Sequence, residues 1–282
     1  MIKKIFENVI LDPLNVIFGR KIFYKFNLII IKIFLKFVGY NNYKNLNKTG
    51  EKKFLDMVIA TGNGCVIDIG ANIGSYSKYI LDNSNYNVIS FEPLKYSFFK
   101  LKKLQRIYKN RLFCFNLALS DKAGKTKIFY SKKNHHWANL DYEVNKITLL
   151  KDNKKRMICK RNSLDNFYKK NKRIFTKETK LIKIDVEGHE YEVLKGSKKF
   201  INKFKPEYIQ IEYNWHHLIK NVNLYQFSKL LPNYDVFKIM PFFNEIYRID
   251  PIKPENNYFN YSNIVFKIKN GRKRASIIPE IY

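Results

Sequence analysis

The segment that most constrains the fold of this chain runs from Cys65 to Tyr76 and reads CVIDIGANIGSY. Its first five residues are apolar apart from Asp68, as in a strand that is buried on both faces of a sheet. Gly70 and Gly74 follow, and glycine permits both a sharp turn and a close approach of the backbone to a ligand. The segment therefore predicts a central parallel strand, a tight loop and a helix start, which is where open α/β sheets bind nucleotides.

The rest of the chain alternates between predicted helices and predicted strands. The strands comprise residues 65–69, 87–92, 112–119, 180–185, 208–213, 234–240 and 263–269. Two further short strands, at 125–130 and 156–161, flank a polar loop and indicate a hairpin or lid inserted at about 121–162. We expect an α/β domain over residues 51–270, with the last two strands forming an antiparallel hairpin at the sheet edge.

Residues 1–50 are predicted to form a helical extension ahead of this domain. Between residues 21 and 38 the chain is apolar except for Asn27 and four lysines. The lysines fall within about 60° of one another on a helix; they are Lys21, Lys25, Lys32 and Lys36. A membrane span is disfavoured, because each lysine would cost about 2.5 to 3.5 kcal/mol at the bilayer centre. Two arrangements remain: the helix packs on the domain or on a partner subunit, or it lies in a membrane interface.

The composition is globular and strongly basic. Hydrophobic residues make up 45% of the chain, and the formal net charge is +29. Such a charge suggests nucleic acid or an anionic membrane as a partner. A competing interpretation is genome composition, since most basic residues are lysine, and Lys, Asn, Ile, Phe and Tyr all have A/T-rich codons. The basic tail at residues 271–282 is expected to be solvated.

The cysteines and the N-terminal sequence indicate in which cellular compartment the protein is expected. Cys65, Cys114 and Cys159 each lie in an apolar strand-like run, without the spacing of a metal site. Core packing in a reducing compartment explains this placement. Because no apolar segment followed by a small-residue cleavage site opens the chain, we expect a cytoplasmic protein. The basic helix allows a peripheral position on the inner face of the membrane.

An acidic residue completes the nucleotide-binding pattern. Glu92 ends the second predicted strand, about 20 residues after the glycine turn, where an acid accepts hydrogen bonds from ribose hydroxyls. Both NAD and S-adenosylmethionine contain that ribose. Asn72, however, stands where the dinucleotide pattern has the glycine that admits a pyrophosphate, which counts against NAD.

At this point the sequence resembles the FkbM family of S-adenosylmethionine-dependent methyltransferases. The resemblance rests on segments that occur in order, namely Val66–Ser77, Phe91–Pro93, Asn116–Asp121, Ser163–Asp165, Ile182–Gly196 and Ile211–Asn214. The family implies an α/β, Rossmann-like class I methyltransferase with a seven-stranded, mostly parallel sheet and one antiparallel edge strand. Similar proteins modify sugar hydroxyls in glycans, lipids or natural products.

The resemblance also implies where the cofactor binds. Asp68, Gly70, Asn72 and Gly74 would surround the methionine part of S-adenosylmethionine, and Glu92 would hold its ribose. Ala118 and Ser120, just past the third strand, would lie near the adenine. Backbone groups can do the same work at this last place.

Four residues at the end of the 180–185 strand and just after it are candidates for catalysis: Asp185, Glu187, His189 and Glu190. Methyl transfer needs an acceptor oxygen in line with the sulfonium methyl group and a base that takes its proton. His189 titrates near neutral pH and suits the base, whereas Asp185 would orient the hydroxyl or the sulfonium. Glu187 and Glu190 can instead stabilise the start of a helix. The same acids can hold Mg²⁺ through Asp185, although no motif requires a metal.

Residues after the fifth strand and in the inserted loop are candidates for acceptor binding. Glu212, Asn214 and Trp215 follow the strand, with His216 and His217 behind them, and Trp215 can stack on a sugar ring or form part of a buried turn. In the inserted loop, His135, His136 and Trp137 suit either a lid over the acceptor or plain surface positions.

The sequence thus favours an O-methyltransferase that acts on a sugar hydroxyl in a glycan, a glycolipid or another small acceptor. The alternatives are an RNA or other nucleic-acid methyltransferase and a cofactor-binding module without catalysis. The acidic residues at the ends of these strands would make a poor phosphate site. The 180–185 strand also ends without the Pro-Pro-aromatic run that enzymes use to methylate nucleic-acid bases. Nucleic acid is therefore disfavoured as the acceptor. Intact Asp68, Glu92 and Asp185 argue against a degenerate site. The oligomeric state stays open.

Overall fold

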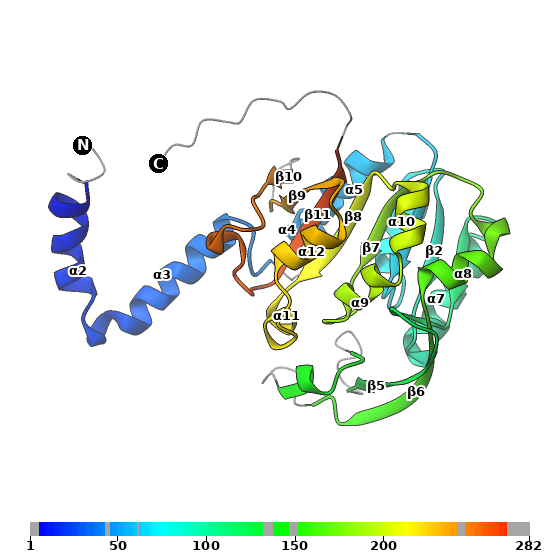
Figure 1. Cartoon of the computed structure of the whole chain (residues 1–282), viewed down its shortest axis with the longest axis horizontal. Helices are drawn as coiled ribbons and strands as arrows, with labels where there is room; N and C mark the ends of the chain where they lie inside the picture. Colours follow the sequence, from blue (N-terminus) through cyan, green and yellow to red (C-terminus); the bar gives the residue numbers. More distant parts are fainter. Residues whose placement is uncertain are drawn as a thin grey trace.

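The structure is a computed structural model that describes residues 6–42, 46–60, 62–131, 138–146, 152–241 and 246–269. Two N-terminal helices project from an α/β body, and a small second sheet lies beside that body (Figure 1). The predicted basic tail at 271–282 and the predicted lid residues His135, His136 and Trp137 fall outside the described ranges.

The centre of the body is an eight-stranded sheet. Its strands are β1 (Cys65–Ile69), β2 (Asn87–Phe91), β3 (Leu112–Phe115), β7 (Thr179–Ile184), β8 (Tyr208–Tyr213), β9 (Tyr234–Ile239), β10 (Ile246–Arg248) and β11 (Ser262–Ile268). The order is β10-β9-β11-β8-β7-β1-β2-β3. The five strands from β8 to β3 are parallel to one another, whereas β11 is antiparallel to both β8 and β9. Four carboxyl ends, those of β1, β2, β7 and β8, therefore meet along one rim.

The predicted α/β fold with a mostly parallel sheet is confirmed, and it differs from the prediction in three details. The sheet has eight strands, because β10 adds three residues that are too few to show a periodic pattern. The reversed strand β11 lies between β8 and β9, so the edge is formed by β10. The strand predicted over 112–119 is divided between two sheets: β3 stays in the large sheet, and β4 (Ala118–Leu119) joins the small one.

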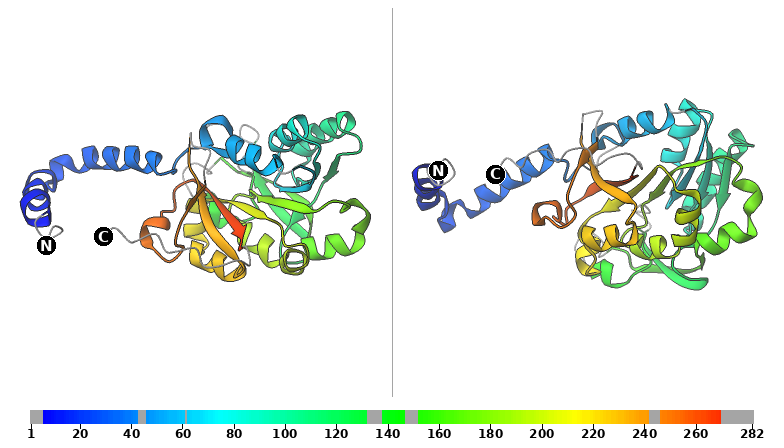
Figure 2. Two further views of the ribbon diagram at one scale, coloured as in Figure 1. Left: turned by 90° about the horizontal axis from the view of Figure 1, so that it is seen from above. Right: turned by 45° about the horizontal axis from the view of Figure 1, so that its top comes forward.

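Helices cover both faces of the large sheet (Figure 2). One layer contains α5 (Glu51–Ile59), α6 (Ser75–Asn83) and α7 (Lys95–Ile107); the other contains α8 (Leu164–Lys170), α9 (Glu190–Lys195), α10 (Lys198–Phe204) and α12 (Leu224–Leu230). Alternate strand residues serve the two layers, since Val66 packs with the first group of helices and Ile67 with the second. Strand β1 is therefore buried on both sides, which explains its apolar sequence.

The inserted segment forms a separate three-stranded sheet in the order β4-β6-β5. Strands β5 (Gly124–Tyr130) and β6 (Lys155–Asn162) pair antiparallel from Gly124 opposite Arg161 to Tyr130 opposite Lys155. A short 3₁₀ turn, η4 (Glu143–Lys146), lies between them in sequence. Other short elements are η6 (Lys172–Ile174), α11 (Trp215–Ile219) and η7 (Pro254–Asn256).

The N-terminal segment begins with helices that extend away from the body, whereas its last short helix packs beside α5 (Figures 1 and 2). Its elements are η1 (Glu7–Leu11), α2 (Asp12–Phe18), η2 (Lys21–Phe23), α3 (Tyr24–Phe37) and α4 (Leu46–Thr49). Neither α2 nor α3 has a buried residue. In the part of the chain that the structure describes, no helix has the length and apolar character needed to cross a membrane.

Candidate functional site

A cavity of about 1250 Å³ lies at the rim where the parallel strands end. Its wall contains many of the residues predicted for the site, namely Gly70, Asn72, Glu92, Ala118, Asp185, Glu187, Glu212, Asn214 and Trp215. The small sheet contributes Ile128, and the N-terminal helix α3 closes one side with Leu28 and Leu35. Because typical ligand pockets have about 300 to 1000 Å³, the cavity has room for two small molecules side by side.

The loop after β1 is fixed to the end of β2 through Glu92. The backbone N–H of Asn72 donates to Glu92 Oε2 at 2.8 Å, and the N–H of Leu94 donates to Oε1 at 2.7 Å. Asn72 takes a left-handed conformation with φ of 50°, which asparagine tolerates better than most residues. Burial raises the pKa of the Glu92 carboxyl to about 7. Each carboxylate oxygen has a lone pair left for a ligand hydroxyl.

The two predicted glycines serve close backbone packing. Gly70 has φ of 82°, and a Cβ there would lie 1.8 Å from the carbonyl oxygen of Asp185. Gly74 has φ of 90°, and its Cβ would lie 2.7 Å from the side chains of Leu101 and Leu104 on α7. Gly70 borders the cavity, whereas Gly74 is not on the described wall. The loop is therefore held against β7 on one side and α7 on the other.

A buried lysine that the sequence did not single out also lines the cavity. Lys183, on β7, is 7% exposed, and its Nζ lies 2.9 Å from Asp185 Oδ2 and 4.0 Å from Asp68 Oδ1. Burial alone would lower the pKa of Lys183, but the nearby carboxylates of Asp185, Asp68 and Glu51 raise it above its usual value. Asp68 is fully buried and accepts a hydrogen bond from Ser77 Oγ at 2.6 Å. The predicted cofactor residue Asp68 thus supports the rim from below.

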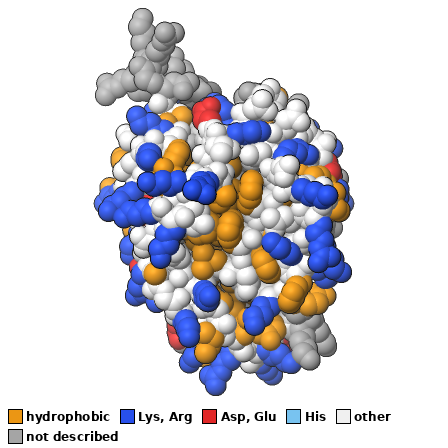
Figure 3. Space-filling view, turned by 90° about the vertical axis from the view of Figure 1, so that its right-hand side faces the viewer, with side chains coloured by type: hydrophobic (Ala, Val, Ile, Leu, Met, Phe, Trp, Pro, Cys, Tyr) orange, Lys and Arg blue, Asp and Glu red, His pale blue; other side chains and the backbone are white. Residues whose placement is uncertain are grey.

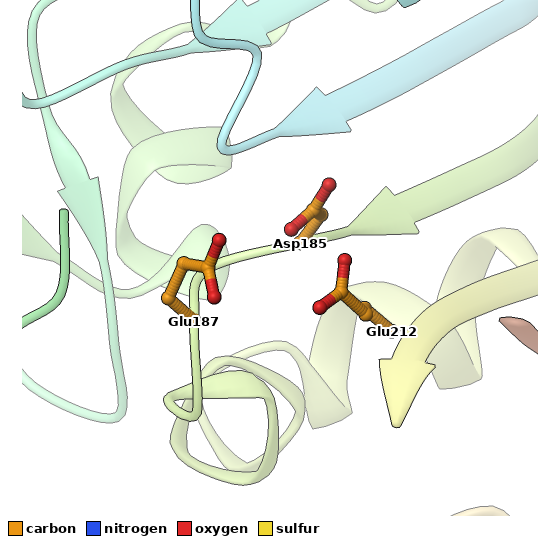
Figure 4. Close-up of side chains that lie close together, drawn as sticks. All are labelled: Asp185, Glu187 and Glu212. Carbon is orange, nitrogen blue, oxygen red and sulfur yellow. The ribbon is translucent and has the colours of Figure 1, made fainter. Parts of the chain in front are cut away.

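Three carboxylates converge in the cavity: Asp185, Glu187 and Glu212 (Figure 4). One oxygen of each lies within 4.8 Å of the others. Burial, together with the charge of Asp185, raises the pKa values of Glu187 and Glu212 well above the ordinary range. Such a set can accept hydrogen bonds from the hydroxyls of a bound molecule, and its oxygens are also the ligand type that Mg²⁺ prefers.

The position of Glu187 depends on an unusual backbone. Glu187 has φ of 55° and Gly188 has φ of 96°, so the chain makes two successive left-handed steps after β7. A left-handed conformation costs about 1 to 2 kcal/mol for a residue with a Cβ. Glu190 closes this loop, because its Oε1 accepts from the N–H of Val186 at 2.9 Å and from that of Gly188 at 3.3 Å. The strained step directs the Glu187 carboxylate toward Asp185 (Figure 4).

Besides Asp68 and Gly74, three further predicted site residues are not on the described wall of the cavity: Ser120, His189 and Glu190. His189 Nε2 lies 2.9 Å from Ser120 Oγ, and burial lowers the pKa of the imidazole. Glu190 is 1% exposed and faces His217 Nε2 at 3.0 Å. Although burial alone would raise the pKa of Glu190, His217 and the backbone donors lower it. These contacts stabilise the conformation of the backbone at the rim of the sheet.

The segment after β8 supplies the remaining polar wall. Asn214 caps α11, because its Oδ1 accepts from the N–H of His216 at 2.9 Å, and its Nδ2 donates to Glu212 Oε1 at 2.5 Å. His216 Nδ1 lies 3.3 Å from Glu187 Oε2, and burial lowers the pKa of His216 to about 4, so the ring is neutral. Trp215 borders the cavity beside them. Glu212, Asn214 and Trp215 are thus brought together at one side of the cavity.

Comparison with protein families decides the identity of this site. The model of the methyltransferase FkbM domain matches residues 68–260, which is well over half of the chain. The chain belongs to the FkbM methyltransferase family. The match covers the glycine loop, Glu92 and the three carboxylates.

Solved structures give more distant likenesses. The methyltransferase domain of bacterial CtHen1-CN has 12% identity and a TM-score of 0.36, covering 78% of this chain and 100% of that chain. Precorrin-6y C5,15-methyltransferase from Geobacter metallireducens GS-15 has 14% identity and a TM-score of 0.41, covering 82% and 93%. SMU.1697c from Streptococcus mutans, solved in complex with S-adenosylhomocysteine (SAH), has 13% identity and a TM-score of 0.42, covering 78% and 96%. Comparison with curated proteins gives no match.

This FkbM methyltransferase uses S-adenosylmethionine as its methyl donor. The residues present fit that cofactor, because Glu92 is a buried acceptor with lone pairs to spare. When bound, the cofactor supplies an electrophilic methyl group. The chain itself must hold the acceptor in line with that group and accept its proton.

Replacing the buried lysine should destabilise the fold. Lys183→Met leaves Asp68 and Asp185 without a compensating charge, so the free energy of unfolding should fall by about 3 to 5 kcal/mol. Denaturant titration followed by circular dichroism measures this change. Exposed Lys198→Met is the matched control and should change stability by less than about 0.5 kcal/mol. Equal stability of the two variants would contradict the compensating role.

Two variants of Glu187 should separate backbone strain from charge. Glu187→Gly and Glu187→Ala remove the same carboxylate, but only glycine relieves the left-handed strain. The glycine variant should therefore be about 1 kcal/mol more stable than the alanine variant. Denaturation midpoints of both proteins provide the measurement, and identical midpoints would show that Glu187 is not strained.

Proposed function

We propose that this enzyme methylates a hydroxyl group, and that its acceptor is a sugar in a glycan, a glycolipid or a related small molecule. The observation that carries the proposal is the convergence of Asp185, Glu187 and Glu212 in the cofactor cavity. Neighbouring sugar hydroxyls each need an acceptor, and three carboxylates offer several lone pairs in a small space. The size of the cavity supports the presence of donor and acceptor together.

Glu187 is our candidate for the base. A carboxylate with a raised pKa is a stronger proton acceptor, and burial together with the charge of Asp185 raises the pKa of Glu187. Asp185 is fixed by Lys183 at 2.9 Å, and Glu212 is fixed by Asn214 at 2.5 Å, so these two are suited to orient the sugar. Trp215 at the wall can stack on the sugar ring. His189, beside Ser120, has no part in this scheme.

In the same scheme, Glu92 accepts hydrogen bonds from the ribose hydroxyls, and the loop with Gly70 and Asn72 lies along the methionine part. Ala118 lies on the wall near the end of β3, where the adenine would bind. Asp68, Gly74 and Ser120 would act indirectly, by holding these groups in place. No metal enters the scheme, because Lys183 already supplies a fixed positive charge beside Asp185. The same carboxylates would repel a phosphate, so nucleic acid is not our candidate acceptor.

Glu187→Gln should separate catalysis from cofactor binding. The amide cannot accept the hydroxyl proton, so turnover should fall by about 10²- to 10⁴-fold, whereas S-adenosylmethionine should bind as before. A panel of free sugars and glycolipids with radiolabelled methyl donor reports transfer, and calorimetry reports binding. The control is Glu192→Gln, which lies off the described cavity wall and should keep turnover. Full turnover by the Glu187 variant would rule out its role as the base.

Cofactor affinity should depend on the ionisation of Glu92. Its carboxylate form accepts ribose hydrogen bonds, so ribose binding lowers the pKa of about 7 and affinity should fall as the pH drops from 8 to 6. Glu92→Gln should weaken binding by about 1 to 3 kcal/mol and flatten this dependence. Calorimetric titration of both proteins over that range isolates Glu92, because every other titrating group is shared. Parallel pH profiles would exclude the ribose contact.

A further inference from the structure

Helix α3 has two opposite faces, and only one of them belongs to the cavity. The cavity face contains Leu28, Ile31, Lys32, Leu35 and Lys36, which all contribute to the cavity wall. At 100° per residue, the apolar residues Phe26, Ile29, Ile30, Ile33, Phe34 and Phe37 fall within about 140° of one another on the other side. This outer face has no charged residue, and Phe34 and Phe37 are 61% and 65% exposed.

The apolar surface continues from α3 into the preceding helices. Ile22 is 83% exposed, and Val9, Ile10, Val16 and Ile17 are exposed as well. The corner between α2 and α3 is fixed, because Asn27 Nδ2 donates to the carbonyl of Phe18 at 2.8 Å and Phe18 contacts the ring of Phe23. The two helices are therefore held in a fixed relation, and exposed apolar side chains lie on both of them. An apolar surface of this extent marks an interaction site.

The charge of this segment limits what can cover the apolar surface. Between Asp12 and Glu51 the sequence has no acidic residue, and the stretch from Arg20 to Lys36 carries five basic ones, which are Arg20, Lys21, Lys25, Lys32 and Lys36. Lysines are also spread over the body, as on the face in Figure 3, so charge alone does not single out α3. What distinguishes α3 is that it combines a stripe of lysines with a wide apolar face. A second copy of the chain would bring two basic segments together, which disfavours self-association.

We propose that α2 and α3 bind an anionic lipid bilayer, with the outer face of α3 among the acyl chains and its lysines among the headgroups. Interfacial helices have this division between a lysine-rich face and an aromatic and aliphatic face. The 14 residues of α3 span only about 21 Å, which is shorter than the roughly 30 Å of a bilayer core, so the helix lies in the interface plane. Negative headgroups attract the lysines.

This orientation places the cavity at the level of the headgroups. The cavity lies on the side of α3 opposite to the acyl chains, at a distance of about one helix diameter, roughly 10 Å. A hydroxyl carried by a lipid headgroup can therefore reach the cavity without leaving the membrane. This consequence for the acceptor rests on the proposed function, whereas binding of the bilayer by α2 and α3 does not.

Vesicle co-sedimentation of the full-length protein tests the surface itself, without cofactor or acceptor. Vesicles of phosphatidylcholine mixed with phosphatidylglycerol should bind the protein, and phosphatidylcholine alone should bind it weakly. Phe34→Ala with Phe37→Ala should lower partitioning by about tenfold or more, because two exposed rings no longer enter the bilayer. Phe99→Ala with Ile107→Ala is the matched control on α7, where the side chains are 67% and 70% exposed, and should leave partitioning unchanged.

The lysines have a separate test. Lys21→Gln and Lys25→Gln should each lower partitioning to the mixed vesicles by about fivefold, since each lysine adds roughly that factor near an anionic surface. Lys198→Gln and Lys199→Gln, on the exposed side of α10, are the controls and should have no effect. Equal losses in both pairs would show that general charge, and not α3, binds the vesicles, and would overturn the proposal.

Depth measurement tests the orientation. The three native cysteines are buried, so Phe37→Cys and Leu28→Cys, which lie about 180° apart on the helix, can each be labelled with a fluorophore that responds to polarity. On mixed vesicles the Phe37 position should show a blue shift, and the Leu28 position should stay in a polar environment. The opposite pattern would overturn the orientation. No vesicle binding would overturn the proposal. A dimer in sedimentation velocity that Phe34→Ala with Phe37→Ala dissociates would also overturn it, and would assign the surface to a second copy.

Discussion

The site depends on one buried positive charge. Lys183 lies within the central β7 strand, and its ammonium group is surrounded by the carboxylates of Asp68, Asp185 and Glu51. Removing several carboxylates from water is costly unless a charge compensates them, and this lysine is the compensating charge beneath the rim. It allows the carboxyl ends of β1 and β7 to lie side by side while both carry acids. The acidic cavity above can therefore exist inside a strongly basic protein.

The chemistry of the rim arises from two opposing constraints. Burial and mutual repulsion raise the pKa values of Glu187 and Glu212, while hydrogen bonds from Lys183 and Asn214 hold Asp185 and Glu212 in fixed positions. The left-handed backbone conformation of Glu187 lowers the stability of the fold, and an ordinary helix start does not have this conformation. Such local strain is common where a side chain must be directed at a substrate.

Much of the fold could be predicted because β1 and the strands after it carry clear apolar patterns and turn residues. The rim positions of Asp185 and Glu212 followed from the ends of those strands. The role of Lys183 could not be predicted, since a lysine in a strand can equally face solvent, and only the pairing of β7 with β1 brings it near Asp68. Likewise, the sequence suggested His189 as a base, but the left-handed turn before it leaves the imidazole beside Ser120.

The contact between Gly70 and the carbonyl of Asp185 has a mechanical consequence. Because a Cβ at residue 70 would lie 1.8 Å from that oxygen, and because Asp185 N donates to Ile69 O at 3.0 Å, the segments that follow β1 and β7 touch through backbone atoms. Because main-chain atoms form this contact, replacing nearby side chains cannot increase the spacing between the two segments. A change in acceptor preference is therefore expected to come from substitutions at the opening of the cavity, at Trp215 and in the inserted sheet, and not from this backbone contact.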